Sequence, residues 1–301
     1  MKSIHVIINP AAGKGMPVLT TLNDAFGDRV KWDVSITHGP GEARQHARQA
    51  LADGVDIVAV CGGDGTVSEV ASAMARHAAP MAILPGGTGN GVARFLNLPL
   101  DLHHAAALLT SDFEVRPIDL GRVNEHTFML RADLGFMEAT DAATTRVSKG
   151  HLGKWAYALS SIRQRNLLGA ATHYALEIDG NDVEIEAVTI LVVNIGAVAF
   201  GRKALVHDLA PDDSYLDLLI LTRRDTVALA EVASSVVLGN RTPMLHWRMK
   251  KVVIHTNPKQ RLALDGEVVE DTPAVIEVQP HAVNVVVPRM NAALPMSNLQ
   301  R

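Results

Sequence analysis

The chain has 301 residues, 48% of them hydrophobic, and a formal net charge of −4 at pH 7. The slightly negative charge excludes global electrostatic attraction to nucleic acid, so nucleic acid is not an expected partner. A single cysteine excludes an intramolecular disulfide, and no apolar run approaches the ~20 residues of a membrane span. The N-terminus shows no signal-peptide pattern, so we expect a cytoplasmic protein.

The first 120 residues alternate strand and helix signals. Strands are expected at Ile4–Ile8, Val30–Ile36, Asp56–Val60 and Met81–Leu84, and helices at Val18–Phe26, from Gly41 to Leu51 and at Val67–His77. The continuous apolar run of the third strand is typical of a strand covered on both faces. This order of elements predicts an α/β domain with a doubly wound parallel sheet.

The second half reads as many strands joined by polar turns, which predicts a β-rich antiparallel sandwich. One helix, His151–Arg165, interrupts these strands. We therefore predict a first domain over 1–122 and a second over 123–287, with the tail 288–301 returning to the first. The expected strands are Glu125–Ala132, Thr172–Ile178, Val183–Asn194, Leu216–Thr222, Met249–His255, Arg261–Leu264, Ala274–Val278 and Val283–Val287.

Two glycine loops, Gly62–Thr66 and Pro85–Gly91, each follow an expected strand and open an expected helix. Ligands of open parallel sheets bind beyond the carboxyl ends of the strands, where both loops fall. Backbone amides at such loops bind phosphate, and Thr66 and Thr88 can donate their hydroxyls to it. Asp64 would then bind Mg²⁺ or accept a proton from an attacking hydroxyl. The alternative is a pair of tight turns, with Asp64 as a helix cap.

A third loop, Asn9–Gly15, also ends an expected strand. It lacks the Gly-Lys-Ser/Thr ending of a Walker A motif. Lys14 can reach a phosphate from this loop or remain solvated.

Three motifs together resemble the catalytic domain of diacylglycerol and sphingosine kinases, and most closely the bacterial lipid kinase branch. They are Asn-Pro-x-x-Gly at Asn9–Gly13, Gly-Gly-Asp-Gly-Thr with a following Glu69, and Pro-x-Gly-Thr-x-Asn before Gly91. The resemblance continues into the second half, at Gly153–Tyr157, Ala210–Asp217 and Asp265–Glu267.

The resemblance implies a nucleotide-binding α/β domain, a lipid-substrate domain, and a cleft between them where a lipid hydroxyl is phosphorylated. It implies ATP and Mg²⁺ as cofactors, diacylglycerol as substrate, and a place in phospholipid biosynthesis. Asp265 is the implied general base, with Glu267 and Asp64 near the reaction. The residues implied to bind the nucleotide are Asn9, Gly13, Lys14, Gly62, Gly63, Gly65, Thr66, Glu69, Gly87, Thr88 and Asn90.

Departures from the family pattern bear on metal binding. Gly91 stands where the family commonly has aspartate, so metal binding must depend on Asp64 or other groups. Ser214 stands where the family's acidic turn has glycine, and a structural Mg²⁺ site would use Asp213 and Asp217. The family's Gly-Phe-Asp-Ala stretch reads Gly-Phe-Met-Glu at 135–138.

Further alternatives stay open. NAD kinase shares the Gly-Gly-Asp-Gly motif, and a non-catalytic nucleotide or lipid sensor fits the departures. Leu152, Trp155, Leu159 and Ile162 form a helical stripe flanked by basic residues, typical of either an interfacial helix or a helix packed on its own domain. The expected partner is a lipid substrate at the inner membrane face, with peripheral membrane contact, and the chain is compatible with a homodimer.

Overall fold

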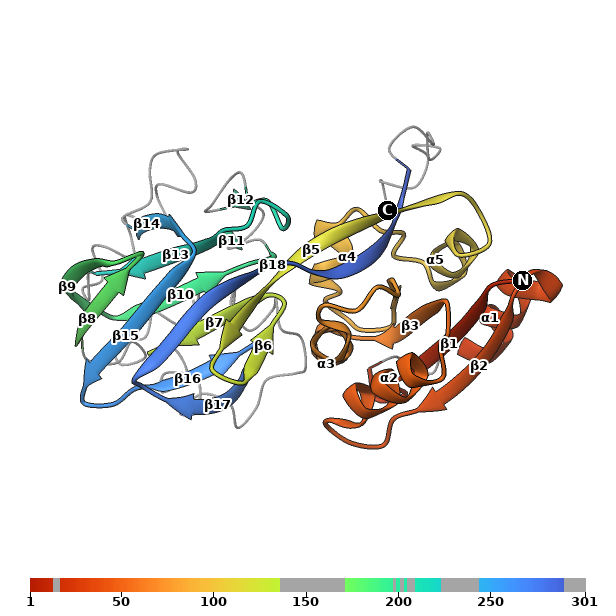
Figure 1. Ribbon diagram of the computed structural model, residues 1–301, viewed down its shortest axis with the longest axis horizontal. Coiled ribbons are helices and arrows are strands. Elements are labelled where there is room, and N and C mark those ends of the chain that lie inside the picture. The colour runs from red at the N-terminus through yellow and green to blue at the C-terminus, as the bar shows by residue number, and fades with distance from the viewer. Residues whose placement is uncertain are drawn as a thin grey trace. The chain divides into compact units, whose positions relative to one another are not determined.

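The computed structural model describes residues 1–12, 17–135, 171–196, 199–200, 203–204, 209–222 and 244–289. The chain divides into two compact units, the first formed by Met1–Pro117 and Val283–Arg301, the second by Ile118–Ala282. In Figure 1 the first unit runs from red to yellow, and its C-terminal segment is blue because it comes from the other end of the chain. None of the helices in these ranges combines the length and apolarity needed to cross a bilayer.

The first unit is built on a parallel sheet with strand order β2-β1-β3-β4, followed by the end of β18. Its strands are β1 (Ser3–Ile8), β2 (Lys31–Ile36), β3 (Ile57–Gly62) and β4 (Met81–Pro85), and its helices are α1 (Val18–Phe26), η1 (Gly27–Arg29), α2 (Glu42–Ala52), α3 (Asp64–Met74), α4 (Gly91–Phe95) and α5 (Leu102–Leu108).

Helices cover both faces of this sheet. Every residue of β3 and β4 is buried, as in strands enclosed on both sides. Helices α1 and α5 pack together and share a core with Ile4, Ala59 and Leu84. Helices α2 and α3 pack against each other and against β3 (Figure 1). The predicted doubly wound arrangement is therefore confirmed, within a sheet that becomes mixed beyond β18.

Helix α3 begins earlier than the sequence indicates. Gly63 is its N-cap residue, and Asp64, Gly65 and Thr66 lie in its first turn. Glycine and threonine are weak helix formers, which hides this turn in the sequence. The glycine motif is thus the start of a helix as well as a loop, and its first-turn amides point out of the helix N-terminus.

The second unit consists of two antiparallel sheets around a shared core. One sheet has the order β14-β13-β10-β7-β16-β17, and the other continues from β18 through β15 and β8 to β9. Buried residues from both sheets, such as Ile190, Leu218, Tyr174 and Ile254, form one cluster. The sandwich predicted for this half is confirmed. Its elements are β6 (His126–Phe128), β7 (Arg131–Leu134), β8 (Thr172–Ile178), β9 (Asn181–Ala187), β10 (Thr189–Val193), β11 (Ala199–Phe200), β12 (Lys203–Ala204), β13 (Leu216–Leu221), β14 (Met244–Met249), β15 (Lys251–Asn257), β16 (Arg261–Leu264) and β17 (Glu267–Asp271).

Two long strands carry the chain between the units. β5 (Phe113–Val123) and β18 (Ala274–Pro288) pair with each other (Figure 1). The sequence predicts two strands where β18 is a single one, because Pro280 and His281, whose φ is 50°, interrupt the alternation. It also predicts one strand over Val183–Asn194, where the structure has the separate strands β9 and β10.

Candidate active site

The carboxyl ends of the four parallel strands form one edge of the first unit. At the end of β1, the Asn9 amide donates to the Cys61 carbonyl at 2.9 Å, and at the end of β2 the Thr37 amide donates to the Ile8 carbonyl at 2.9 Å. The two glycine loops follow β3 and β4 at the same edge. This edge is where ligands of open parallel sheets bind.

The two glycine loops touch backbone to backbone. The Gly86 amide donates to the Gly62 carbonyl at 3.0 Å. A Cβ on Gly87 would lie 2.7 Å from Gly63 Cα, and a Cβ on Gly62 would lie 2.7 Å from Thr66 Cβ. Only glycine fits these positions without movement, so the loops need glycine for packing as well as for ligand access. The result is a surface of backbone amides at the N-terminus of α3.

Asp64 joins the two loops. Its Oδ1 accepts a hydrogen bond from the Val92 amide at 3.1 Å, in the first turn of α4, and the residue is buried. A carboxylate in the first turn of α3 also interacts favourably with the helix dipole. Asp64 is therefore not the N-cap of its own helix, as the alternative expected, because Gly63 takes that position; its carboxylate instead accepts from the first turn of α4.

Two asparagines fix the conformations of the loops. Asn9 Nδ2 donates to Thr66 Oγ1 at 2.9 Å, which orients that buried hydroxyl. Asn90, with φ of 48°, closes the second loop on itself: its Oδ1 accepts from the Gly87 amide at 2.9 Å and its Nδ2 donates to the Gly87 carbonyl at 2.8 Å. Thr88 lies in the loop that these two contacts close. Asn9 and Asn90 thus have structural contacts in addition to their predicted nucleotide role.

Glu69 faces the start of α2. Its Oε1 accepts from the Gly41 amide at 3.0 Å, while its Oε2 is buried and has no hydrogen-bond partner. Gly41 is the N-cap residue of α2, with φ of 84°. Glu69 therefore stabilises the loop that follows β2, a strand separated by β1 from β3, which the glycine motif follows.

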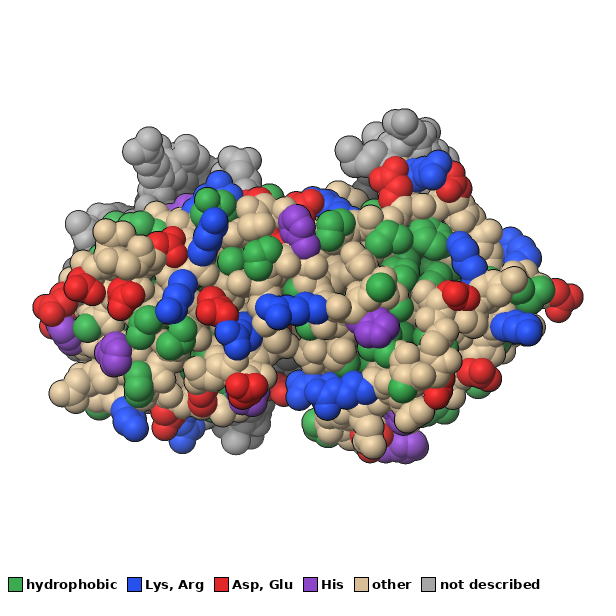
Figure 2. Space-filling view, viewed as in Figure 1, with side chains coloured by type: hydrophobic (Ala, Val, Ile, Leu, Met, Phe, Trp, Pro, Cys, Tyr) green, Lys and Arg blue, Asp and Glu red, His purple; other side chains and the backbone are tan. Residues whose placement is uncertain are grey.

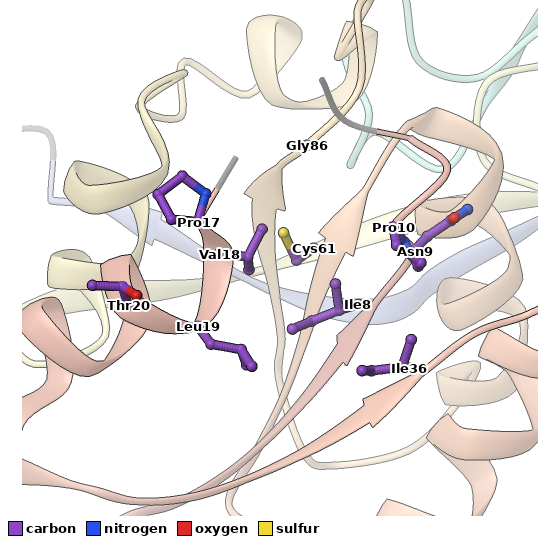
Figure 3. A pocket seen from close by; sticks show the side chains of 10 residues that line it. All are labelled: Ile8, Asn9, Pro10, Pro17, Val18, Leu19, Thr20, Ile36, Cys61 and Gly86. Atoms are coloured by element: carbon purple, nitrogen blue, oxygen red, sulfur yellow. The ribbon is translucent and has the colours of Figure 1, made fainter. Parts of the chain in front are cut away.

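An apolar pocket of about 360 Å³ opens between α1 and the ends of β1, β2 and β3. Figure 3 shows Val18 and Leu19 of α1 facing Cys61 and Ile8 across it. Gly86 of the second glycine loop also lines the pocket, so it adjoins the phosphate-type surface. Burial raises the pKa of the Cys61 thiol to about 11, which keeps it protonated near neutral pH. The sequence gives no signal for this pocket, because its walls come from five separate segments of the chain.

In the second unit, Asp265 and Gly266 form the two-residue turn of the β16–β17 hairpin. Both have positive φ, 50° and 95°, as a type I′ turn requires. The Asp265 carboxylate accepts three backbone hydrogen bonds, from the amides of Met129 at 2.9 Å, Leu130 at 2.9 Å and Arg131 at 2.8 Å. Asp265 is therefore held in one orientation, and Glu267, at the start of β17, is exposed.

A buried ion pair lies beside this turn and is missed by sequence reasoning. Arg131 Nε donates to both carboxylate oxygens of Asp133, at 3.2 and 3.1 Å. Burial raises the pKa of Asp133, with the Arg131 charge opposing and the Asp265 charge reinforcing that shift. Asn194 Nδ2 donates to the Met129 carbonyl at 2.8 Å, so both the amides and carbonyls of this segment are fixed. An Arg-x-Asp spacing on a strand was the available signal, since it places both side chains on one face.

The predicted metal residues Asp213 and Asp217 contact basic side chains. Asp213 Oδ2 forms an ion pair with Arg248, and Asp217 Oδ1 lies 2.6 Å from His246 Nε2. Burial raises the pKa of Asp217, and the bond to His246 opposes that shift. In the part of the chain that the structure describes, no three His, Cys, Asp or Glu side chains are grouped as metal ligands would be.

Some predicted residues lie outside the described residues. They are Gly13 and Lys14 of the first loop, the 136–138 part of the Gly-Phe stretch, and the helix expected at 151–165.

Comparison with known families matches both units. Residues 3–123 match the diacylglycerol kinase catalytic domain, and residues 135–287 match the YegS C-terminal NAD kinase beta sandwich-like domain. A Pseudomonas aeruginosa relative, named "probable lipid kinase YegS-like", is 34% identical over 85% of this chain and 84% of its own length. The diacylglycerol kinase of Bacillus subtilis is 28% identical over 89% of this chain and 90% of its own.

Solved structures show the same fold. One chain from Bacillus anthracis superposes with a TM-score of 0.79 at 27% identity, covering 95% of this chain and 96% of that chain. A diacylglycerol kinase structure from the same organism superposes with a TM-score of 0.73 at 24% identity, covering 95% and 97%. With both units matched and the glycine loops in contact, the chain belongs to the diacylglycerol kinase family of lipid kinases.

Proposed function

We propose that this lipid kinase transfers the γ-phosphoryl group of ATP to the hydroxyl of diacylglycerol. In that reaction a bond forms between the lipid oxygen and the γ-phosphorus, and the bond to the β–γ bridging oxygen breaks. ADP leaves, and the hydroxyl proton passes to a carboxylate. Such chemistry depends on positioning and charge stabilisation more than on covalent steps by the protein.

The contact between the two glycine loops is the observation that carries this proposal. Gly62, Gly63, Gly86 and Gly87 bring two backbones together so closely that a side chain at Gly87 would meet Gly63 Cα. The amides of the first turn of α3, around Gly65, and the dipole of this 11-residue helix then act on one phosphate group. We assign Thr66 and Thr88 as hydroxyl donors to the same phosphates.

The apolar pocket supports binding of the nucleotide base. Its walls combine aliphatic side chains of α1 and β1 with Cys61, and it reaches Gly86 of the phosphate surface. Small-molecule sites are typically concave and largely apolar, with a few polar groups at one end. The pocket and the loops lie at the same edge of one sheet, as a base and its phosphates require.

Asp265 is the proposed proton acceptor. Three amide donors hold its carboxylate in one orientation, so the group is pre-organised toward a single approach direction. The exposed Glu267 adds a second negative charge on the same hairpin. Two of the three amides, those of Met129 and Leu130, directly precede β7, and the third, of Arg131, begins it; the Arg131–Asp133 ion pair lies on this strand.

Asp64 fits Mg²⁺ bound together with ATP. Mg²⁺ takes one or two carboxylates along with substrate phosphates, and Asp64 is a carboxylate in the first turn of the helix that faces the phosphates. One of its oxygens contacts Val92, so the residue is held in place. When bound, the ion would neutralise charge on the transferring phosphate.

We place the protein in the cytoplasm, with its lipid substrate reached at the inner face of the membrane. Charged side chains of both signs are interspersed over the face in Figure 2. Contact with the membrane is proposed to be local and peripheral.

The test is a radiolabelled ATP assay with mixed micelles of diacylglycerol, sphingoid base or a total-lipid extract, and with NAD in solution. We expect label in the phosphate ester of diacylglycerol. Label found only in NAD phosphate would overturn the proposal, as would ATP binding without transfer to any lipid.

A further inference from the structure

The acidic turn at Asp212–Asp217 belongs to the second unit and takes no part in the reaction proposed above. It resembles a family stretch that implies a structural Mg²⁺ site. Such an ion would need carboxylate oxygens of Asp213, Asp217 and the neighbouring Asp119 as ligands.

The turn is held by hydrogen bonds of its own. The Ser214 amide donates to Asp119 Oδ2 at 2.6 Å, and the Tyr215 amide donates to Asp213 Oδ1 at 3.0 Å. The Asp119 amide in turn donates to the Pro211 carbonyl at 2.7 Å. Ser214 has a φ of 64°, which is unfavourable for an L residue, and the bond from its amide to Asp119 helps to hold this conformation.

The carboxylate charges in this region are already partnered. Asp119 uses its second oxygen, Oδ1, to accept from the His281 amide at 2.7 Å. Asp213 Oδ2 pairs with Arg248, and Asp217 Oδ1 contacts His246 Nε2 at 2.6 Å. A divalent ion would have to displace these partners. Its positive charge would then lie within a few ångströms of the Arg248 guanidinium, where like charges repel.

Both basic residues come from β14, the strand that pairs with β13. Arg248 lies directly opposite Asp217 in this register, and His246 lies opposite Leu219. The Arg248 guanidinium lies 4.7 Å from the centre of the Tyr215 ring, with Lys250 at 5.2 Å. Strand β14 thus brings two basic side chains to the acidic turn, and the aromatic ring adds a cation–π contact that helps to hold Arg248 there.

We propose that Arg248 and His246 take the place of the divalent cation at the acidic turn, so that the fold of the second unit does not depend on metal. The residues Asp213 and Asp217 are then structural carboxylates, not metal ligands.

The experiment compares thermal unfolding of the full chain, without nucleotide, in EDTA and in millimolar Mg²⁺ or Ca²⁺. The proposal expects the wild type and Asp213→Asn to show the same response to metal, within about 1 °C. A metal-dependent rise in the wild type that Asp213→Asn removes would overturn the proposal. Because no ATP or lipid is present, this result is independent of whether the proposed kinase reaction is correct.

A second comparison removes the basic side chains of His246 and Arg248. In the double variant His246→Gln/Arg248→Gln the carboxylates lose their partners, and we expect Ca²⁺ or Mg²⁺ to raise the melting temperature. The rise should be roughly 2–4 °C at about ten times the dissociation constant of the ion. The matched control His246→Gln/Arg248→Lys keeps a cation at 248 and should respond much less. Equal responses of the two variants would contradict the assignment of Arg248 as the replacement for the metal.

Discussion

Replacing Gly87 with alanine tests the contact between the two glycine loops. The added Cβ would lie 2.7 Å from Gly63 Cα and 3.1 Å from Asn90 Oδ1, and the first of these neighbours is backbone that cannot rotate away. The backbone at Gly87 is outside the left-handed region, so the effect is steric and not conformational. Forcing one extra methyl group into such a contact typically costs about 1–3 kcal/mol.

For a value near the middle of that range, about 2 kcal/mol, the melting temperature of the first unit should fall by roughly 4–8 °C. The loops must also separate, so the Michaelis constant for ATP should rise, because the amides no longer act on one phosphate. Calorimetric unfolding and steady-state kinetics at saturating lipid measure the two effects. A variant with unchanged melting temperature and unchanged ATP kinetics would refute the loop contact.

Three further predictions concern single residues. Gly65→Ala places a methyl group in open space in the first turn of α3, so stability should be kept or rise by about 0.5–1 kcal/mol; ATP binding should weaken if phosphate occupies that space, which calorimetric titration measures. Asp265→Asn puts an amide group among the three backbone donors, so turnover should be abolished while ATP binding remains; the stability loss from one unsatisfied donor should stay near 1–3 kcal/mol by chemical denaturation. Cys61 has a pKa raised by burial to about 11, so iodoacetamide labelling, followed by mass spectrometry, should increase about tenfold per pH unit up to pH 10 without a plateau. The same shift predicts that stability falls as pH rises from about 9 toward 11, because the unfolded thiol loses its proton first. A labelling plateau near pH 9 would contradict the burial of Cys61.

The architecture of the first unit was predictable because its strands are short apolar runs bounded by polar or turn-forming residues. β3 is buried along its whole length and is bounded by Val55-Asp56 and by glycine. The strand β5 was missed because its first half is polar and partly exposed, with Pro117 in its middle. Its regularity comes from pairing with β18, a long-range contact that no local pattern reveals.

The candidate site likewise combines local motifs, which the sequence reveals, with long-range contacts, which it does not. The glycine motifs identify the surface where phosphate is proposed to bind, since only glycine fits where Gly62 and Gly87 lie. The partners of these motifs were not predictable, because they are distant in the chain. Met129 is 136 residues from Asp265, and Val92, whose amide donates to Asp64 Oδ1, is 28 residues from Asp64. The basic partners of the acidic turn come from another strand, where neither Arg248 nor His246 forms part of a motif.

The pairing of Val285 with Met81 has a consequence for how the protein is made. The last part of β18 adjoins β4 in the first sheet, so one strand of that sheet is encoded after the entire second unit. During synthesis the edge of β4 stays unpaired while roughly 200 residues are translated, which takes about 10–40 s at ordinary elongation rates. The second unit, contiguous in sequence over Ile118–Ala282, has all its strands before the first sheet is complete. Folding order should therefore run opposite to chain order, and a chain that ends before Val283, once released from the ribosome, should protect the sandwich from protease more than the first unit.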